Sequence, residues 1–474
     1  MTVQPIGGEM LQFTDSDPAG GPSLRPLLGA VTGRTLVAGP HDPALIDALP
    51  AEQITVLVRG VADAEALGER YANRPGVTVC CGSLEKLAAV PSYDSVLALD
   101  GLGRLCTPEA PDLTWDETLG QLLAVLRPHG RLLLGLDNRF GLDRLVALPP
   151  APADSDWTVP DDHPTGPAAL HARLAAAGLP VVREYAAYGT ALLGAEVLID
   201  PALRGYLEAT LTGLFRPRAD LLADPARLLV GALRHGLAAD LAPAWILLAG
   251  DLPAGPAALV GGSSLRRDAT NHWVREDGAP VPAGRTLSDL LVAASERRAQ
   301  PVVRELLTAW QAGPAAGVPA AQIVVDAAGG HHALAPAGTP VGALREFARS
   351  VIDTGLTHLW PAPADEASLT ALLAGMTGRE LSPEQVPAAA RPSAGTVREL
   401  TIARERLERE LAEARAKHEF YERQIASRDA ELKRVRQLNA VLSATVPGKA
   451  ATTLVGGLKA GRRAVRAVVR RTRD

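Results

Sequence analysis

The stretch GRTLVAGPHDPALIDAL (residues 33–49) has the pattern of a buried strand, a turn and the start of a helix. In α/β proteins, a turn at this position is where the binding site for a nucleotide-type cofactor begins. The turn AGPHD (residues 38–42) contains one glycine, whereas such loops usually contain two or three. The stretch therefore predicts the first strand–helix unit of an α/β sheet, and it leaves open whether the turn binds a ligand.

The alternation of strands and helices continues to about residue 136. Further strands are predicted at QITVLVRG, GVTVCCG, YDSVLALDG and GRLLLGLD, and the helical segments are PALIDAL, DAEALGERYA and TWDETLGQLLAVLRPHG, the last with Thr114 as its N-cap. Continuous apolar strands separated by helices predict parallel strands that are covered on both faces. The expected fold class is a doubly wound, Rossmann-like α/β sheet, which binds ligands beyond the carboxyl ends of its strands.

The chain downstream of this sheet divides into shorter segments. A loop rich in Pro and Asp (residues 149–165) precedes a helix and a strand over residues 166–188, and residues 201–240 are predicted to be helical. Near residue 243 a second region begins, with strands at AWILLAGD and AQIVVDAAGG and one helix over residues 286–310. We expect an α+β domain of unclear role there.

Composition limits the class of protein. The chain has 474 residues and a formal net charge of -5, which gives no reason to expect nucleic acid as a partner. Its cysteines, Cys80, Cys81 and Cys106, have neither a disulfide pattern nor zinc-binding spacing, and no metal site is expected. The N-terminus lacks a signal-peptide pattern, and no apolar run reaches about 18 residues. A cytoplasmic protein from a GC-rich bacterium is therefore expected.

The C-terminal part has a heptad pattern from about residue 397. The apolar positions with 3,4 spacing are Val397, Leu400, Leu407, Leu411, Ala414, Tyr421, Ile425, Leu432, Val435 and Leu442, and Arg404, His418, Arg428 and Asn439 share their register. This pattern predicts a coiled coil, with a single solvated helix as the alternative. Asn439 at a core position favours a parallel homodimer, because a buried amide is best satisfied by its own copy across the axis.

The last segment, PGKAATTLVGGLKAGRRAVRAVVRRTRD, is strongly basic and has Asp474 as its one acidic residue. Its apolar residues could share one helical face opposite the arginines; they are Leu454, Leu458, Val465, Val468 and Val469. Such a helix could lie on the anionic inner face of a membrane, which would make the protein peripheral. The alternative is a frayed basic tail.

A family resemblance becomes visible in the later strands. The strand from Tyr93 to Asp100 resembles the fourth strand of class I S-adenosylmethionine-dependent methyltransferases, and LRPHGRLLLGLDN resembles the turn into their fifth strand. DNRFGLDRL and HPTGPAALHARLAAAGL are similar to segments of a bacterial subgroup associated with surface-glycan and secondary metabolism. The resemblance covers about residues 25–195. It implies transfer of a sulfonium methyl group to a small-molecule or glycan acceptor.

The resemblance also implies where S-adenosylmethionine would bind. The family's first loop is glycine-rich, so that the backbone can approach the cofactor closely. The matching residues here are Ala38 and Gly39, and the following Pro40 removes a backbone donor. The family usually ends its second strand with an acid that binds the ribose, but Arg59 stands here and cannot accept a hydrogen bond.

Two further matches are partial. Gly82 and Ser83 stand where the family often has a Gly-Asp pair that contacts adenine. Asp100 ends the fourth strand and is expected either to face the cleft or to cap a turn. Because two of the three cofactor signatures have changed, the domain is expected either to bind S-adenosylmethionine or to keep the fold without this ligand.

Candidates on the acceptor side follow the fifth strand. Asp137 and Asn138 lie where an acceptor would approach, although both residue types also favour turns. His163 could act as a base, or it could be an exposed loop residue without a role. The catalytic residues remain unknown at this point, since methyl transfer by direct displacement requires little more than alignment of the reactants.

The expected division is a flexible N-terminus (1–24), a methyltransferase-like domain (25–200), a helical connection (201–242), an α+β domain (243–392), a coiled coil (393–445) and a basic amphipathic tail (446–474). The leading hypothesis is an S-adenosylmethionine-dependent methyltransferase. The alternative is a non-catalytic scaffold that organises partner enzymes through its coiled coil and tail. A third hypothesis is a domain that binds another nucleotide, with Arg59 on a phosphate.

Overall fold

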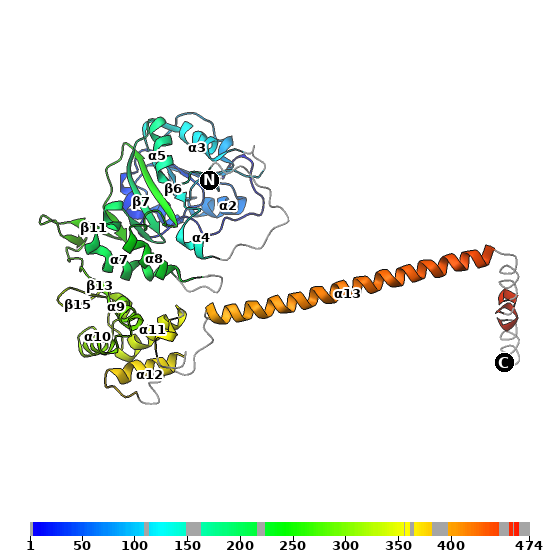
Figure 1. Cartoon of the computed structure of the whole chain (residues 1–474). Helices are drawn as coiled ribbons and strands as arrows, with labels where there is room; N and C mark the ends of the chain where they lie inside the picture. The colour runs from blue at the N-terminus through cyan, green and yellow to red at the C-terminus, as the bar shows by residue number, and fades with distance from the viewer. Residues whose placement is uncertain are drawn as a thin grey trace, which may run out of the picture. The chain divides into compact units, whose positions relative to one another are not determined.

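The computed structural model describes residues 3–108, 113–147, 163–215, 223–354, 356–360, 365–381, 397–444, 455–457 and 459–463. The chain forms two compact units, Met1–Val397 and Arg398–Asp474. The first unit contains the sheet and most of the helices (Figure 1). The described part of the second unit is helical.

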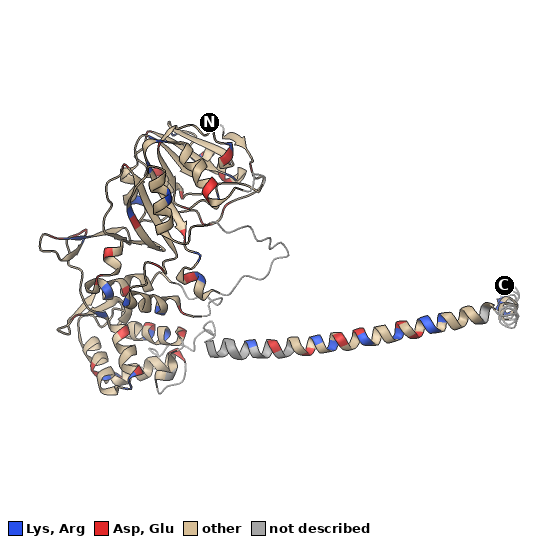
Figure 2. Cartoon of the chain, turned by 45° about the horizontal axis from the view of Figure 1, so that its top comes forward, with Lys and Arg blue, Asp and Glu red and all other residues tan. Residues whose placement is uncertain are grey.

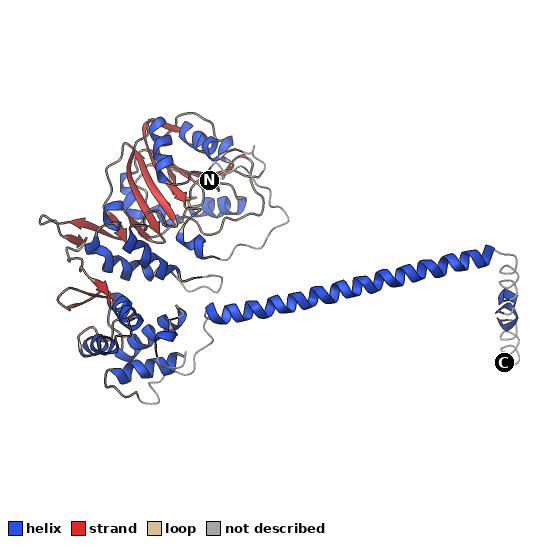
Figure 3. Ribbon diagram, viewed as in Figure 1, coloured by secondary structure: helices blue, strands red, loops and turns tan. Residues whose placement is uncertain are grey.

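A 12-stranded sheet organises the first unit, in the order β1-β4-β3-β2-β5-β6-β9-β7-β8-β10-β11-β12. The strands are red in Figure 3. Its strands are β1 (Gln4–Gly7), β2 (Arg34–Ala38), β3 (Gln53–Val58), β4 (Val77–Gly82), β5 (Tyr93–Ala98), β6 (Leu126–Asp137), β7 (Val181–Tyr188), β8 (Ala191–Leu193), β9 (Ala244–Gly250), β10 (Ala258–Val260), β11 (Ser263–Arg267) and β12 (Trp273–Arg275). The strands β1 to β6 pair in parallel. The predicted parallel α/β sheet is confirmed.

The order of the strands creates a crevice at one edge of the sheet. β2 pairs with β3 on one side and with β5 on the other, so the chain reverses its direction of winding between β2 and β5. Ligands of doubly wound sheets bind outside the carboxyl ends of the strands at such a switch point. The candidate site is therefore expected where β2, β3, β5 and β6 end.

Helices cover both faces of the sheet. They are α1 (Pro43–Asp47), α2 (Val61–Arg70), α3 (Trp115–Ala124), α4 (Leu142–Val146), α5 (Pro167–Ala176), α6 (Ala195–Leu198), α7 (Arg204–Thr212) and α8 (Pro225–His235). Successive strand residues point to opposite faces, so Val96 and Ala98 pack in one apolar cluster with α3 and α5, whereas Leu97 packs in the other with α1 and α2.

The start of α3 agrees with the sequence, and its end does not. Thr114 caps the helix, and Glu117 completes a capping box by accepting from the Thr114 backbone. The helix ends at Ala124, and the residues LRPHG, which were predicted to be helical, begin β6. Pro128 explains the difference, because a proline in a helix interior removes a hydrogen bond and clashes with the preceding turn.

Two predicted domain boundaries differ from the structure. Residues 1–24 were expected to be flexible, but β1 pairs with β4, and Met10 and Ala19 form bridges to Gly60 and His41. The boundary at residue 243 would cut the sheet, because β9 lies between β6 and β7 and is antiparallel to both. Local sequence patterns do not encode such an insertion from a distant segment.

A helical lobe with its own core follows the sheet. Its elements are β13 (Arg285–Thr286), α9 (Leu287–Glu296), α10 (Gln300–Ala312), β14 (Ile323–Val325), β15 (His331–Ala333), α11 (Pro340–Asp353) and α12 (Glu366–Met376). The single helix predicted over residues 286–310 is two helices, with Arg298 between them at a φ of 56°. Pro301 lies in the first turn of α10, where a proline is tolerated.

The helix α13 (Val397–Ala444) is continuous through the predicted heptads. Basic and acidic residues are interspersed along the coloured part of this helix (Figure 2). Several heptad-core side chains are exposed, among them Leu411, Tyr421, Ile425, Leu432 and Val435. The helix itself is confirmed, and its pairing as a coiled coil stays a prediction.

Most of the basic tail lies outside the described residues, including the apolar positions from Leu454 to Val469 that were singled out above. Within the described ranges, none of the helices combines the length and the apolar character needed to cross a membrane.

Candidate functional site

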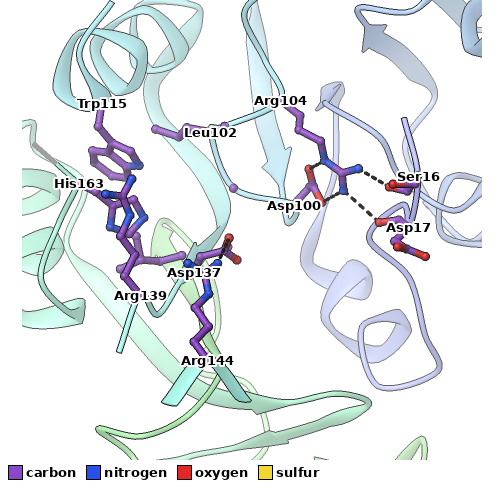
Figure 4. Close-up of a pocket in the computed structure, with 14 residues that line it drawn as sticks. Ser16, Asp17, Asp100, Leu102, Arg104, Trp115, Asp137, Arg139, Arg144 and His163 are labelled. Atoms are coloured by element: carbon purple, nitrogen blue, oxygen red, sulfur yellow. Dashed lines mark hydrogen bonds and ion pairs between the residues drawn. The ribbon is translucent and has the colours of Figure 1, made fainter. Parts of the chain in front are cut away.

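A cavity of about 610 Å³ opens beyond the carboxyl ends of β5 and β6 (Figure 4). It is lined by Ser16, Asp17, Asp100, Gly101, Leu102, Gly103, Arg104, Trp115, Gly135, Leu136, Asp137, Arg139, Arg144 and His163. Most of its side chains are polar or charged, and both signs of charge are present. Three of the residues predicted from the sequence, Asp100, Asp137 and His163, line this cavity.

One wall of the cavity is built on the Asp100–Arg104 ion pair. Nε and Nη2 of Arg104 each donate a hydrogen bond to the carboxylate of Asp100. The same guanidinium donates to the backbone carbonyls of Ser16 and Asp17 (Figure 4). Burial raises the pKa of Asp100, although Arg104 opposes this effect. The pair therefore fixes the turn after β5 to the N-terminal part of the chain.

The opposite wall carries aromatic and basic groups. Asp137, the last residue of β6, pairs with Arg144 at 3.3 Å. The ring of Trp115 meets the ring of His163 edge-on, with 6.0 Å between the centroids. Nδ1 of His163 lies 2.9 Å from the carbonyl oxygen of Pro164. This wall can bind a polar ligand that presents both a charged group and a flat face.

Asn138 does not face the cavity. Its amide nitrogen donates to the carbonyls of Asp240 and Ala242, at 2.7 and 2.8 Å, and its side-chain oxygen accepts from the Phe140 amide at 2.9 Å. The side chain is buried. Its hydrogen bonds hold the turn after β6 to the segment that precedes β9, which is the turn-forming role left open by the sequence.

The turn after β2 is closed by His41. Its Nδ1 lies 3.1 Å from the Gly39 carbonyl, and its Nε2 lies 3.2 Å from the Leu99 amide. Burial lowers the pKa of His41 to about 4, so the ring is neutral near pH 7. A neutral ring that donates to Gly39 and accepts from Leu99 joins β2 to β5 across the switch point. Ala38 and Gly39 are buried beneath it.

Arg59, at the end of β3, is paired within the chain. Its guanidinium makes two hydrogen bonds to the Asp15 carboxylate, at 2.7 and 3.1 Å, and one to the Cys106 carbonyl at 3.3 Å. The side chains of Arg59 and Asp15 are only 15% and 3% exposed. The ring of Phe13 lies 5.0 Å from the guanidinium carbon. A ribose could not bind here unless Asp15 moved.

The turn after β4 is also filled. A Cβ atom added to Gly82 would come within 2.4 Å of the Gly7 carbonyl oxygen. Ser83 is buried; its hydroxyl accepts from the Thr107 amide at 3.2 Å and donates to Glu85. Gly82 therefore packs against the chain's own backbone, and the Ser83 hydroxyl is already hydrogen-bonded within the chain.

The cofactor groove is defined here as the carboxyl ends of β2, β3 and β4, and the N-terminal segment as residues 8–19. The segment crosses the groove. Met10 exchanges backbone hydrogen bonds with the β3 end, and Ala19 exchanges them with the turn after β2. In this arrangement five of the predicted cofactor positions do not fit S-adenosylmethionine, because Ala38, Gly39, Gly82 and Ser83 are buried and Arg59 is paired with Asp15. The sixth, Asp100, lines the cavity.

Several residues of the site were not predicted from the sequence. Asp15 lies in a polar, glycine-rich segment without periodicity. The one signal available was Arg59 at the end of a buried strand, because a buried arginine needs an acidic partner. His41 stands in the turn AGPHD, yet its bridge to Leu99 depends on the pairing of β2 with β5. Arg104 lies four residues after Asp100 in the turn that follows β5, so the two opposite charges are close together along the chain.

In the part of the chain that the structure describes, no group of three or more His, Cys, Asp or Glu side chains could hold a metal ion.

Neither a protein-family model nor a curated protein matches the sequence. Solved structures do match part of it. A chain of the complex between the Haloferax volcanii methyltransferase activator and its assigned methyltransferase has 14% identity, 49% coverage of this chain, 89% coverage of that chain and a TM-score of 0.30. The cyclase SpnF has 18% identity, coverages of 53% and 88%, and a TM-score of 0.28.

A third similar structure is the Burkholderia thailandensis 1,6-didemethyltoxoflavin-N1-methyltransferase, which contains 1,6-didemethyltoxoflavin and S-adenosylhomocysteine. It has 19% identity, coverages of 34% and 68%, and a TM-score of 0.22. Methyltransferases are thus prominent among the solved structures that this chain resembles. Since one fold hosts many activities, the activity of this chain has to be argued from its own site.

Proposed function

We propose that this protein is a non-catalytic member of the methyltransferase fold, in which the N-terminal segment closes the cofactor groove. The cavity beside the groove then binds a small polar ligand, and the long helix brings copies of the domain together as a scaffold for partner enzymes. The observation that carries this proposal is the Arg59–Asp15 ion pair, because it occupies the place of the ribose-binding acid with a buried, internally satisfied contact.

Two other features support a closed groove. The neutral His41 ring joins the ends of β2 and β5, where the crevice of a doubly wound sheet would open. Pro40 also removes a backbone donor from the first turn. A methyl donor would have to displace the segment and break these contacts before it could bind.

Calorimetric titration of S-adenosylmethionine and S-adenosylhomocysteine into the full chain tests the proposal. We expect no heat of binding at millimolar ligand, because the groove is filled by the chain. Micromolar binding of either compound to the wild-type protein would sink the non-catalytic proposal.

S-adenosylmethionine-dependent methyl transfer is the second candidate. It is favoured by the cavity itself, because the predicted cofactor residue Asp100 and the acceptor-side candidates Asp137 and His163 line the same cavity beyond the carboxyl ends of β5 and β6. The acceptor would be a small molecule or a glycan intermediate. This candidate requires that residues 8–19 leave the groove, and the same titration decides it.

The scaffold part of the proposal rests on α13 as a parallel homodimer. In the predicted register Lys417 and Glu431 occupy g positions, and Glu422 and Arg436 occupy e positions of the following heptads. A parallel, in-register pair of helices would place Lys417 opposite the partner's Glu422 and Glu431 opposite the partner's Arg436. Both contacts are attractive, and Asn439 would meet its own copy.

Lys417→Glu is expected to weaken this dimer, because it places an acid opposite Glu422 twice by symmetry. The dissociation constant should rise roughly five- to tenfold. Arg423→Glu is the matched control, since Arg423 lies at an outward f position and donates to the backbone of its own helix. Sedimentation equilibrium of both variants measures the effect; equal weakening by the two changes would argue against the parallel register.

The basic tail extends the scaffold proposal to a membrane surface. Its described residues include Lys459, Arg462 and Arg463, which are exposed. Lysine and arginine side chains close to one another attract anionic lipid headgroups. We infer a peripheral contact with the inner face of the membrane through residues 446–474, in addition to the contacts with partner enzymes.

A further inference from the structure

The Asp15 carboxylate has the environment of a bound anion. Arg59 binds it through two nitrogens, at 2.7 and 3.1 Å, and Arg104 approaches it at 3.8 Å. Two arginines around one carboxylate, with bidentate geometry on one side, form the arrangement by which proteins recognise carboxylate and phosphate groups. Here the anion belongs to the chain itself.

The site is continuous with the cavity described above. Arg104 lines the cavity, and so do Ser16 and Asp17, whose carbonyls accept from Arg104 (Figure 4). If residues 13–17 withdrew, the anionic position at Arg59 and the cavity would form one open space. A ligand could then place an anionic group between the arginines and its remaining atoms in the cavity.

The N-terminal segment is held in a way that allows displacement. As whole residues, positions 3–20 are half-buried or exposed, although the Asp15 side chain is itself buried. The segment is fastened at its two ends, by the backbone hydrogen bonds of Met10 and Ala19, and near its middle by Asp15. Gln12 and Asp17 have φ values of 53° and 50°, which are unfavourable for residues other than glycine. Withdrawal of residues 13–17 would relieve the strain at Asp17, and none of these five side chains belongs to the apolar clusters beside the sheet.

We propose that Arg59 and Arg104 form an anion-binding site for a ligand with a carboxylate or phosphate group, and that Asp15 occupies this site until such a ligand displaces it. The inference rests on the proposed function, because it takes the groove to be closed to S-adenosylmethionine. It adds the chemical class of the ligand and the means by which the groove opens.

Chemical rescue of Asp15→Ala tests the site in the full chain. The variant leaves both arginines without their acid, so small anions should bind in its place and stabilise the fold. At constant ionic strength, sodium acetate or sodium phosphate is expected to raise the thermal midpoint of the variant by about 2 °C or more relative to sodium chloride. Rescue by acetate alone assigns a carboxylate ligand, and rescue by phosphate alone assigns a phosphate ligand.

Two matched variants separate this effect from general salt effects. Asp47→Ala removes the acid of an exposed cluster with Arg70 and Arg74, and neither anion should rescue it specifically. The double variant Asp15→Ala with Arg59→Ala lacks the main side chain that binds the anion, and it should also show no rescue. The proposal is overturned if Asp15→Ala folds and acetate and phosphate raise its thermal midpoint no more than they raise that of Asp47→Ala.

Hydrogen exchange of the wild-type protein gives a readout that does not depend on folding of the variant. Phosphate or acetate at fixed ionic strength should speed exchange of the Met10 and Ala19 amides several-fold, because these amides fasten the displaced segment. If Asp15→Ala does not fold, unchanged exchange of the Met10 and Ala19 amides in the wild type would overturn the proposal instead. Tight binding of S-adenosylhomocysteine to the wild type would contradict only the proposed function.

Discussion

Glu208→Gln is expected to stabilise the protein at pH 8 by about 2–3 kcal/mol. Glu208 lies on α7 and is 2% exposed. Neither of its carboxylate oxygens has a hydrogen-bond partner among the described residues, and the nearest cation, Nε of Arg234, is 3.6 Å away. Burial raises the pKa of Glu208 from the ordinary 4.5 to about 7, and the charge of Asp289 adds to the effect.

The pH dependence has a definite sign. Between about pH 4.5 and pH 7 the folded protein holds a proton on Glu208 that the unfolded chain has released. The free energy of unfolding therefore falls as the pH rises through this window. Arg234, Arg285 and Arg204 oppose the shift, but Arg234 and Arg285 are also paired with Asp289. A neutral amide removes the cost of burying the charge.

Urea unfolding of the wild type and of Glu208→Gln at pH 5 and pH 8 measures the effect. The two proteins should differ little at pH 5 and clearly at pH 8. Glu296→Gln is the matched control, because Glu296 belongs to an exposed ion pair with Arg227 and should show no such difference. If Glu208→Gln were the less stable protein at pH 8, the contact with Arg234 would outweigh the burial of the carboxylate.

Arg59→Asp is expected to lower the free energy of unfolding by about 3–5 kcal/mol. An acid at residue 59 would match the ribose-binding position of the methyltransferase family that the sequence resembles. In the structure the new carboxylate would face Asp15, whose side chain is 3% exposed. Two buried acids would then repel each other, and the Phe13 ring would lose the guanidinium beneath it.

Thermal and urea unfolding of Arg59→Asp measure this loss. Arg70→Asp is a suitable control, because Arg70 makes the same type of contact with Asp47 at an exposed position. Exposed ion pairs contribute little to stability, so this control should change the unfolding midpoint only slightly. Equal and small effects of the two substitutions would mean that Asp15 does not hold the N-terminal segment in the groove.

The sequence predicted the central sheet well because its strands are continuous apolar runs. Residues such as Val96 and Leu133 belong to strands that are buried on both faces, and this burial is visible in composition alone. The place of β9 between β6 and β7 was not predictable in this way. It depends on which edge of the sheet a distant segment reaches, and local periodicity does not carry that information.

The candidate site was predicted only in part, for a related reason. Asp100, Asp137 and His163 follow strands or a loop at the correct edge, and they line the cavity. Ala38, Gly39, Gly82 and Ser83 lie at the same edge, but the N-terminal segment and the neighbouring turns bury them. The middle of that segment has no strand or helix pattern from which its position could be predicted. The contact between Asp15 and Arg59 positions it instead.

A double-mutant cycle between Asp15 and Arg59 tests most directly whether the chain closes its own groove. The free energy of unfolding is measured for the wild type, Asp15→Ala, Arg59→Ala and the double variant. A buried, bidentate pair predicts a coupling energy of about 2 kcal/mol or more, so that the double variant loses far less stability than the two single variants together. Additive losses would show that the two side chains do not meet, and the groove would then be open.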